Sequence, residues 1–575
     1  MLLFLVMKQN VIKIVKINFA LVLTAMVVGL ITSLVTQIFA LTAKSIFLLI
    51  QDSQNINFLQ FSFFSFSGSF LPLIACISAG ILVGLLIKSQ KIDRWHGPAD
   101  TIYAAHQQAG TLDVKRGFTS TLAAFFSISG GASVGIYGPL VHFGGTLGAF
   151  LRRRKFIPTI PHDIIIGAGV AAAISAGFSS PIAGIVFAHE VVLRHFSMRA
   201  LTAISLSSVT ASFTAHEMDL VTPALRFDEI VFDLITALPG LLITGLIASL
   251  IAFLFMKSLL FSTMLSNSSN IKFHLRPLIP AALCGFAGIF LPESIGLGTE
   301  TIVNVITSEN TIIFLLMVLI FKLILSSLCI GFGLFGGVFS PALLLGACTG
   351  ALIFNIPFIG IANDIGPILA VSGMAAVSSS VIGGPITAII LVFELTGSYE
   401  YAIASIFPIA ICNLITYLIF GSSFFDAQLK ARKIPMGHGR EHILMSQTII
   451  EKYADKNYLK FDKKIKTDDA IKKFKKYSLT EGYFLDKNGN YLGKLRLIDI
   501  IDLKDKISFN YNEKNHIKLL PTDNLINTMK KLGKFIGESV PIIDKNNKFI
   551  GVISENDVLN AYSNISETIR NIEKN

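Results

Sequence analysis

The chain has 575 residues and a formal net charge of +11, with 52% hydrophobic and only 15% charged residues. A soluble globular chain carries about 25% charged residues. Together with a mean hydropathy of +0.66, this composition excludes a wholly soluble protein. The positive charge does not imply a nucleic-acid partner, since Lys and Arg collect in the cytoplasmic segments of membrane proteins. The cysteines lie in apolar stretches without metal-ligand spacing, which argues against a disulfide framework or a metal site.

Apolar runs alternate with Gly- and Pro-containing breaks over the first three quarters of the chain. Several runs are shorter than the ~20 residues that span a bilayer. Near residue 435 the composition changes to Lys, Asp and Asn, which predicts a membrane body followed by a soluble tail. We expect a cytoplasmic N-terminus over 1–17 and a transmembrane domain over 18–435, with apolar runs at 18–41, 70–87, 165–176, 201–213, 231–256, 311–332 and 402–420.

Basic residues flank these runs unevenly. They cluster before the first run, after the second, at 152–155 and at 430–433. The positive-inside rule places such clusters in the cytoplasm. We therefore expect a multi-pass protein of the cell's inner (plasma) membrane, with both termini cytoplasmic and an even number of crossings.

Two motifs recur at nearly constant spacing. Gly131-Ala-Ser-Val-Gly-Ile-Tyr-Gly-Pro139 returns 202 residues later as Gly333-Leu-Phe-Gly-Gly-Val-Phe-Ser-Pro341. The segment from Pro181 to Glu190 returns 204 residues later, from Pro385 to Glu394. The membrane body is therefore predicted to be duplicated, with repeat one over about 18–220 and repeat two over about 229–430.

Each copy of the first motif places a Gly-rich turn directly before a Pro and an apolar helical run. Pro is favoured in the first turn of a helix, and Gly lets the backbone approach an ion closely. Broken helices at matching positions of two halves mark the midplane site of a transporter. Their free N–H groups and positive dipole ends favour an anion. The alternative is ordinary helix packing through small residues.

With these motifs the sequence resembles the voltage-gated chloride channel (CLC) family of channels and transporters over about residues 18–435. Gly135–Pro139 stands where that family has GxEGP, Gly337–Pro341 matches GxFxP, Trp95–Asp100 falls where members have GSGIP or GHGPAD, and Gly384–Thr396 matches another signature. The resemblance implies an all-α polytopic membrane protein with two inverted repeats of tilted and broken helices. It also implies a homodimer with one anion path per subunit.

The sequence departs from the family at two proton-carrying positions. The gating glutamate of GxEGP is Tyr137 here, and the second proton-carrying glutamate is Val191. A phenol, with an unperturbed pKa of about 10, stays neutral at physiological pH and cannot mimic a bound anion. Glu190 and its repeat partner Glu394 are expected to have a structural role near helix ends, with proton transfer as the alternative for Glu190. Proton coupling is left with no obvious vehicle.

Two anion ligands of the family also differ. Its central Ser corresponds to His96, and the Tyr of its last membrane helix corresponds to Phe425, which has no hydroxyl. We expect Tyr137 either to replace the lost hydroxyl donor or to plug the path. His96 contributes either its backbone alone or a ring whose protonation near pH ~6.5 favours anions. The candidate anion-binding residues, with Tyr137 at the gate position, are His96, Gly97, Gly135, Ile136, Tyr137, Gly138, Pro139, Gly337, Val338, Phe339, Ser340 and Phe425.

The tail carries its own repeat, because residues 486–499 and 544–557 match at an offset of 58. Each copy reads as strand, turn, strand and the start of a helix. The pattern resembles a pair of small α/β CBS modules at about 445–505 and 515–570. The resemblance implies an adenine-nucleotide site (ATP, ADP or AMP) through a Ser/Thr and an Asp, kept as Ser554 and Asp557 in the second copy but as Arg496 and Asp499 in the first. A purely structural pair that aids dimerisation is the alternative.

The favoured function is passive, chloride-selective movement of anions through the lipid bilayer, regulated by the tail. A proton-coupled anion exchanger with other proton carriers is the first alternative, and a non-conducting membrane nucleotide sensor is the second. No cofactor is required. An enzyme is not expected, because the membrane body shows no nucleophile–base pair or metal-spaced cluster. His142 and His189 stand alone on apolar helices and are predicted to be packed polar residues rather than ligands.

Overall fold

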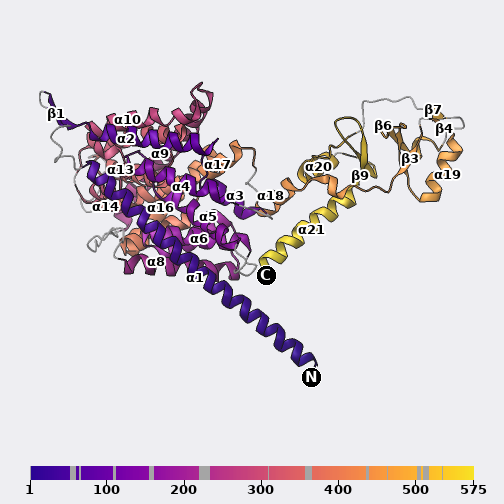
Figure 1. The fold of residues 1–575 in the computed structure, drawn as a ribbon, viewed down its shortest axis with the longest axis horizontal. Coiled ribbons are helices and arrows are strands. Elements are labelled where there is room, and N and C mark those ends of the chain that lie inside the picture. The colour runs from indigo at the N-terminus through magenta and orange to yellow at the C-terminus, as the bar shows by residue number, and fades with distance from the viewer. Residues whose placement is uncertain are drawn as a thin grey trace. The chain divides into compact units, whose positions relative to one another are not determined.

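A computed structural model describes most of the chain as two compact units, Met1–Ile434 and Pro435–Asn575 (Figure 1). The predicted repeat limits at 220 and 229, the predicted end of the transmembrane domain at 435 and the predicted module limits at 505 and 515 lie outside the described residues. The structure describes residues 2–51, 60–63, 66–107, 112–153, 161–218, 234–308, 310–356, 365–434, 439–462, 464–501, 507–508, 517–533, 535 and 537–574.

The membrane unit consists of helices (Figure 1), and their order along the chain falls into two matching series. Repeat one holds α1 (Leu2–Gln51), α2 (Leu71–Gln90), α3 (Pro98–His106), α4 (Val114–Ser129), α5 (Tyr137–Arg152), α6 (His162–Phe178), α7 (Pro181–Phe187) with the π-helical η3 (Ala188–Leu193), and α8 (Met198–Glu217). Repeat two holds α9 (Leu234–Ser268), α10 (Leu278–Phe290), α11 (Thr299–Thr307), α12 (Ile312–Phe332), α13 (Phe339–Phe354), α14 (Gly366–Ile382), α15 (Pro385–Thr396) and α16 (Tyr399–Phe420). The short α17 (Phe424–Ala431) closes the unit, and smaller elements are β1 (Gln60–Phe63), β2 (Phe66–Ser69), η4 (Phe273–Leu275) and η5 (Pro292–Ser294).

The predicted cytoplasmic N-terminus over 1–17 is part of the first helix for the residues that the structure describes. The helix α1 runs through residue 17 without a break. Residues 2–28 contain neither Pro nor Gly, so nothing in the sequence interrupts the helix there.

Equivalent helices of the two repeats make equivalent contacts. Helix α5 packs on α6 as α13 packs on α14, and α1 packs on α8 as α9 packs on α16. Between the repeats, α2 packs on α10 and α7 on α15, so each of these contacts joins an element to its own counterpart. Contacts of this self-complementary kind are those of a two-fold arrangement.

Glycines allow the two short-helix pairs to cross closely. A Cβ atom on Gly144 of α5 would collide with the carbonyl oxygen of Gly169 on α6, and the same holds for Gly346 of α13 and Gly373 of α14. Small residues at helix crossings are the usual means of tight packing in membranes. The duplicated sequence thus produces a duplicated core.

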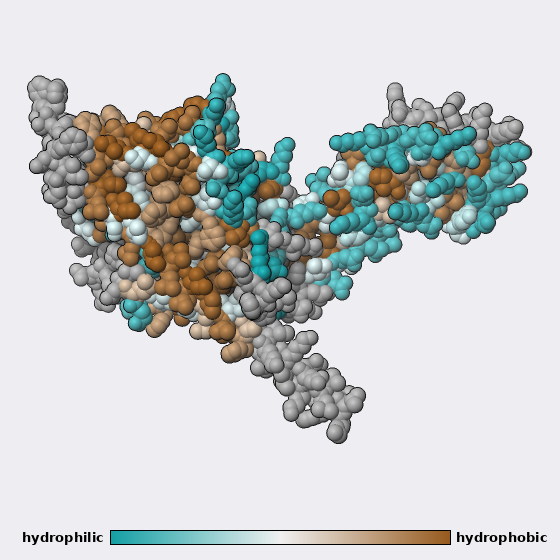
Figure 2. All heavy atoms as spheres, viewed as in Figure 1, coloured by the Kyte–Doolittle hydropathy of each residue, from teal (hydrophilic) through white to brown (hydrophobic). Residues whose placement is uncertain are grey.

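Within the described residues, six helices are long and apolar enough to cross a membrane. They are Phe19–Ile50, Leu71–Gln90, Leu234–Ser268, Phe273–Phe290, Ile312–Phe332 and Tyr399–Ala431. The face of this unit seen in Figure 2 is largely hydrophobic, as lipid-facing helices require. Large apolar side chains such as Phe261 on α9 and Tyr417 on α16 are more than 60% exposed.

The tail unit contains two antiparallel hairpins with the same register. β5 (Glu481–Leu485) pairs with β6 (Tyr491–Arg496), and β8 (Ser539–Ile543) pairs with β9 (Phe549–Ser554), each with an irregularity before its last pair. The offset of 58 residues that the sequence indicates therefore appears again in the strand pairing. The remaining elements are β3 (Leu459–Phe461), β4 (Lys464–Ile465), β7 (Ile507–Ser508), α18 (Gly439–Gln447), α19 (Thr467–Tyr477), α20 (Leu525–Leu532), α21 (Glu555–Lys574), η6 (Ile450–Tyr453) and η7 (Leu497–Asp499).

Candidate functional site

The two Gly-rich turns of the membrane unit lie against each other. The N–H of Gly135 donates to the carbonyl of Gly337 at 2.7 Å, and the N–H of Gly337 donates back to the carbonyl of Gly135 at 2.6 Å. A Cβ atom on Gly138 would stand 2.8 Å from the Cα of Gly337, and one on Gly135 would stand 2.9 Å from its carbonyl oxygen. Glycine is required here because no side chain fits between the turns.

Helices α5 and α13 begin directly after this pair of glycines. Their N-cap residues, Ile136 and Val338, provide no side-chain hydrogen bond, whereas Ser197 caps α8 and Thr311 caps α12. The N–H groups of a first helical turn have no partner within the helix. Two uncapped positive helix ends therefore meet at one buried place, which is the arrangement that favours a bound anion.

Three aromatic rings fill the space beside the uncapped ends. Tyr137, 5% exposed, stacks on Phe178 with ring centroids 3.6 Å apart and an angle of 14° between the planes. Phe339 packs edge-on against both, at 5.8 Å from Tyr137 and 5.3 Å from Phe178. Within the described residues, the Tyr137 hydroxyl makes no hydrogen bond. Sequence reasoning missed Phe178, whose only signal is its position just before the second motif.

Two further predicted residues are Ser340, which lies beside the turns, and Phe425, which lies on α17. The Ser340 hydroxyl is buried, has no partner among the described residues, and would stand 2.7 Å from a Cβ on Gly135. Phe425 is buried on α17, which packs against α3 and α14. A phenyl ring in that position donates no hydrogen bond, so Ser340 is the hydroxyl that the site still has available beside Tyr137.

The start of α3 forms a third side of this region. Pro98 would lie 3.7 Å from a Cβ on Gly138, and the Phe335 ring 3.6 Å from a Cβ on Gly97. The backbone N–H of His96 donates to the Ser120 hydroxyl at 3.1 Å, so that N–H is already used. Both roles expected for His96 remain predictions, and this bond bears on the backbone role because it uses the N–H.

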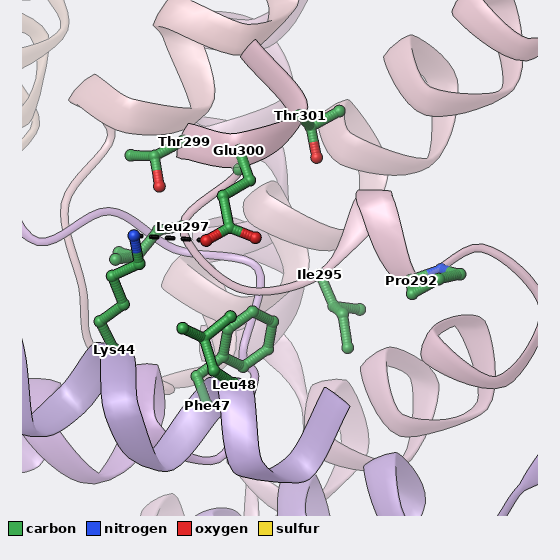
Figure 3. A pocket seen from close by; sticks show the side chains of 10 residues that line it. Lys44, Phe47, Leu48, Pro292, Ile295, Leu297, Thr299, Glu300 and Thr301 are labelled. Atoms are coloured by element: carbon green, nitrogen blue, oxygen red, sulfur yellow. Dashed lines mark ion pairs between the residues drawn. The ribbon is translucent and has the colours of Figure 1, made fainter. Parts of the chain in front are cut away.

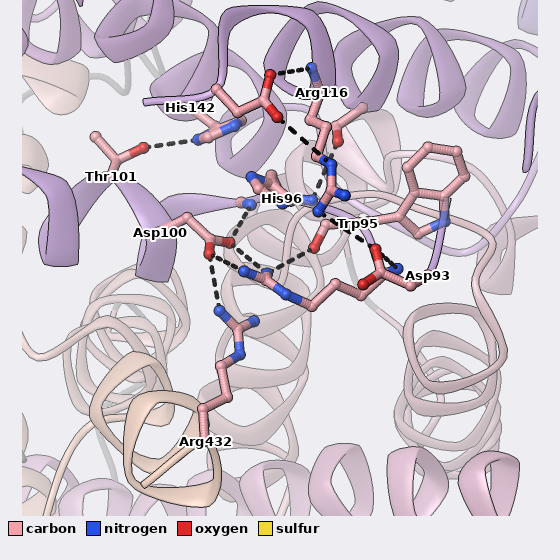
Figure 4. A network of polar contacts seen from close by, with 12 residues as sticks. Asp93, Trp95, His96, Asp100, Thr101, Arg116, His142 and Arg432 are labelled. Carbon is pink, nitrogen blue, oxygen red and sulfur yellow. Dashed lines mark hydrogen bonds and ion pairs between the residues drawn. The ribbon is translucent and has the colours of Figure 1, made fainter. Parts of the chain in front are cut away.

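The carboxylate of Asp100 joins several segments beside His96 (Figure 4). It accepts from both terminal nitrogens of Arg94 at 3.1 and 2.8 Å, from Arg432 at 2.9 Å and from the N–H of Gly97 at 3.0 Å. Burial opposes ionisation of Asp100, but the bonds and charges of the two guanidinium groups outweigh it and hold its pKa well below the usual range. Two cations thus keep this buried carboxylate charged.

The same surroundings act on His96. Burial lowers the pKa of the ring; Asp100 partly opposes this effect, and Arg94 and Arg116 reinforce it. His96 is therefore neutral at physiological pH and gains a proton only in more acidic solution.

The two glutamates of the second motif lie at helix ends, as expected. Glu190 accepts from the N–H groups of Ile386 and Thr387 at the start of α15, at 3.0 and 2.8 Å. Glu394 accepts from Ile182 and Ala183 at the start of α7, at 2.9 and 2.8 Å. Each repeat therefore supplies the carboxylate that caps a helix of the other repeat.

Val191 follows Glu190 within η3 and is buried. It would stand 2.9 Å from a Cβ on Gly384 and brings no ionisable group to that position. π-Helical turns often occur at functional sites.

In the tail, the two residues expected to bind nucleotide bond to each other. A carboxylate oxygen of Asp557 accepts from the N–H of Ser554 at 2.8 Å and from its hydroxyl at 2.7 Å. In the first copy, Arg496 and Asp499 form an ion pair at 2.8 Å. The Asp557 carboxylate holds the start of α21, so a ribose would have to compete with Ser554 for it.

A small pocket lies elsewhere in the membrane unit, between the end of α1 and residues 292–301 (Figure 3). Lys44 and Glu300 form an ion pair of 3.3 Å at its edge. None of the residues predicted for the anion site lines it.

The fold and the site together define a class of protein. A multi-pass helical unit built twice, with broken helices meeting at a buried electropositive point, is the architecture of a membrane transport protein. A family model described as "voltage gated chloride channel" matches residues 79–418, and a CBS domain model matches residues 512–564. The chain belongs to the voltage-gated chloride channel family and carries a C-terminal CBS domain. Members of this family are channels and transporters rather than enzymes.

Relatives and solved structures agree with this assignment. The chain is 25% identical over 338 residues to the voltage-gated ClC-type chloride channel ClcB of Salmonella typhimurium, which covers 57% of this chain and 80% of ClcB. It is 25% identical over 344 residues to the H+/Cl− exchange transporter ClcA of Yersinia pestis, covering 56% and 70%. The fold is similar to a slow cyanobacterial Cl−/H+ antiporter (TM-score 0.63, 19% identity, covering 72% and 98%) and to a eukaryotic CLC transporter (TM-score 0.61, 15% identity, covering 94% and 98%).

Proposed function

We propose that the protein moves chloride-like anions passively across the plasma membrane, as a homodimer with cytoplasmic termini. The observation that carries this proposal is the mutual bridge of Gly135 and Gly337, which brings the uncapped ends of α5 and α13 to one point. Backbone N–H groups can hydrogen-bond an anion at this point, so no charged side chain is needed to bind it. Chloride is favoured because relatives of both kinds are named for it.

Passive movement follows from the side chains at the two positions where the family resemblance implies proton carriers. Tyr137 and Val191 have no group that exchanges a proton near neutral pH. Without a carboxylate that alternates between anion mimic and neutral acid, anion movement is not tied to a fixed number of protons.

Tyr137 serves as a steric gate in this proposal. Its ring stacks on Phe178 and contacts Phe339, so the aromatic cluster occupies the region beside the helix ends. This packing favours the plug over the hydroxyl donor, since the hydroxyl bonds no described residue. Anions pass when the Tyr137 ring leaves Phe178.

Proton-coupled exchange is the second candidate, and one observation favours it. His195 lies 3.6 Å from the carboxylate of Asp163, and the buried His189 precedes Val191 by two residues. An imidazole ring is a side chain that can take up and release a proton. These histidines are therefore the groups that would replace the missing glutamate in an exchanger.

Flux from proteoliposomes with simultaneous proton recording tests both candidates. Passive movement predicts chloride efflux with no opposed proton uptake in the wild type. Tyr137→Glu is expected to add a pH-dependent gate, and the single change Val191→Glu serves as its matched control. Stoichiometric proton movement in the wild type would establish the exchanger, and its loss in His195→Gln would assign the carrier. If no variant passes anions, both transport candidates are wrong, and the alternative of a non-conducting nucleotide sensor remains.

The tail is proposed to regulate this movement by binding an adenine nucleotide at the start of α21. The residues that support this proposal are Ser554 and Asp557, which stand at the helix start and bond each other. Calorimetric titration of the full chain with ATP, ADP and AMP tests it, with Asp557→Ala as the control. No heat from any of the three nucleotides would leave the CBS pair a structural, dimer-forming unit.

A further inference from the structure

Two imidazole rings from different elements meet beside the start of α3. His142 on α5 is 1% exposed and His96 is 8% exposed, with ring centroids 6.1 Å apart and planes at 57° (Figure 4). The Nε2 atoms of both rings are buried and have no hydrogen-bond partner in the described part of the chain. An unpaired buried polar atom costs about 1–3 kcal/mol. Two such atoms on neighbouring rings suggest a ligand between them.

Thr101 determines what the His142 ring can offer. Its hydroxyl oxygen lies 2.8 Å from Nδ1 of His142. In a neutral imidazole one nitrogen donates and the other accepts. When the Thr101 hydroxyl donates to Nδ1, the ring proton must reside on Nε2, so Nε2–H is an available donor.

We propose that His142 is an anion-binding residue, positioned by Thr101, whose Nε2–H and the His96 ring together bind a halide at one end of the path. This inference rests on the proposed function, because it supplies a second site to the same anion path. It changes the expectation that His142 is only a packed polar residue. Thr101 acts through His142 and is a positioning residue.

The charged side chains beside His96 pair with one another. Asp100 pairs with Arg94 and Arg432, and Arg116 pairs with Asp93 and Asp113. The choice of an anion therefore rests on the Nε2–H donor of His142. A metal ion is disfavoured, since no group of three or more His, Cys, Asp or Glu side chains with suitable geometry occurs among the residues described. A monoatomic anion accepts from two N–H donors at any angle, which suits rings that are tilted to each other.

The first experiment follows the imidazole nitrogens directly. The full-length protein, labelled with ¹⁵N at histidine, is titrated with chloride in nanodiscs, with gluconate as the control anion. His142→Gln identifies the His142 signals. We expect the His142 Nε2–H signal to shift on adding chloride, and Thr101→Val to shift the tautomer toward Nδ1–H. Chloride that leaves these signals unmoved, or a tautomer that does not respond to Thr101→Val, would overturn the proposal.

The second experiment compares chloride affinity by calorimetry in matched variants. His142→Leu is expected to weaken binding about tenfold, the change that corresponds to about 1.4 kcal/mol. Thr101→Val is expected to approach this loss, while Thr101→Ser restores most of the affinity. His106→Gln is the control, because His106 is also buried but its Nδ1 bonds the carbonyl of Ile102 at 2.8 Å.

The outcomes separate this inference from the proposed function. A wild type that neither binds nor passes chloride contradicts the proposed function and the inference with it. A wild type that binds and passes chloride, with equal affinity in His142→Leu, overturns the inference alone. If His142→Leu does not fold, the nitrogen shifts of the wild type and the affinities of Thr101→Val and Thr101→Ser decide.

Discussion

The two Gly-rich turns have the same backbone arrangement but carry different side chains. Each turn bonds the other through a glycine, and each is followed by an uncapped helix. The first helix then begins with Tyr137 and Gly138, and the second with Phe339 and Ser340. The duplicated backbone therefore sets the electropositive point, while the side chains that differ between the halves decide what controls access to it.

The largest expected effect comes from breaking the backbone that both turns share. A side chain at Gly138 would approach the Cα of Gly337 to 2.8 Å. Overpacking of this kind costs about 1–3 kcal/mol or more, and here it separates the turns. We expect Gly138→Val to abolish chloride flux and to lower the thermal unfolding temperature of the purified protein.

Gly97→Ala is the matched control for that change. Its Cβ would meet only the Phe335 ring at 3.6 Å, an ordinary contact, at extended backbone angles. The variant should fold as well as the wild type by the same thermal assay. Equal stability of Gly138→Val and Gly97→Ala would contradict the close approach of the turns.

The reciprocal carboxylate caps offer a second comparison between the halves. Hydrogen bonds to a charged group are worth about 1.5–3 kcal/mol. We expect both Glu190→Gln and Glu394→Gln to destabilise the membrane unit by about 1–3 kcal/mol in denaturation measurements. Glu190→Gln should cost more, because Glu190 also accepts from the Thr387 hydroxyl at 2.7 Å. Thr387→Val should remove that difference. If Glu394→Gln were less stable than Glu190→Gln, the extra bond from Thr387 would not explain the difference between the two caps.

Tyr137 and Phe339 occupy equivalent positions and provide the third test. Aromatic pairs contribute about 0.5–1.5 kcal/mol, which corresponds to roughly a two- to tenfold change in an equilibrium. If the ring of Tyr137 is the gate, Tyr137→Ala raises chloride flux by that factor and Tyr137→Phe leaves it nearly unchanged. Liposome efflux rates measure both.

A fall in flux for Tyr137→Phe would instead show that the Tyr137 hydroxyl donates a hydrogen bond to the anion. Phe178→Ala should reproduce part of the gain in Tyr137→Ala, since it removes the stacking partner. No change in either alanine variant would exclude the steric gate.

The smallest expected effect concerns pH. Burial lowers the pKa of His96, so the ring becomes charged only below its usual value of about 6.5. A positive charge beside the path attracts anions, and flux is therefore expected to rise modestly as the pH on that side falls from 7 toward about 5. The rise should disappear in His96→Ala. Persistence of the same pH dependence in His96→Ala would place the titrating group elsewhere.

The elements predicted from the sequence are those with a repeated local pattern. Both Gly-rich turns precede a proline at a fixed distance, so their helix starts at Tyr137 and Phe339 follow from the motif itself. The tail hairpins were predictable for the same reason, because Asp486 and Asp544 begin matching turns. Duplication supplies each pattern twice and makes its recognition secure.

The contacts that were not predicted join residues far apart in the chain. Phe178 stacks on a residue 41 positions earlier, and Arg432 reaches Asp100 across 332 positions. His142 was expected to be packed alone, since nothing in an apolar helix indicates that another imidazole lies beside it. Such pairings depend on how the helices cross, which the local pattern does not determine.

The Asp100 side chain holds the C-terminal end of the membrane unit in place through its ion pair with Arg432. Arg432 stands two residues before Ile434, where this unit ends, and the same carboxylate also holds Gly97 and Arg94 next to His96. Any tension on the polypeptide leaving this unit is applied first to a bond that anchors the loop carrying His96. Because Asp100 lies in the first turn of α3, a pull on this ion pair acts on the start of α3 together with the loop before it.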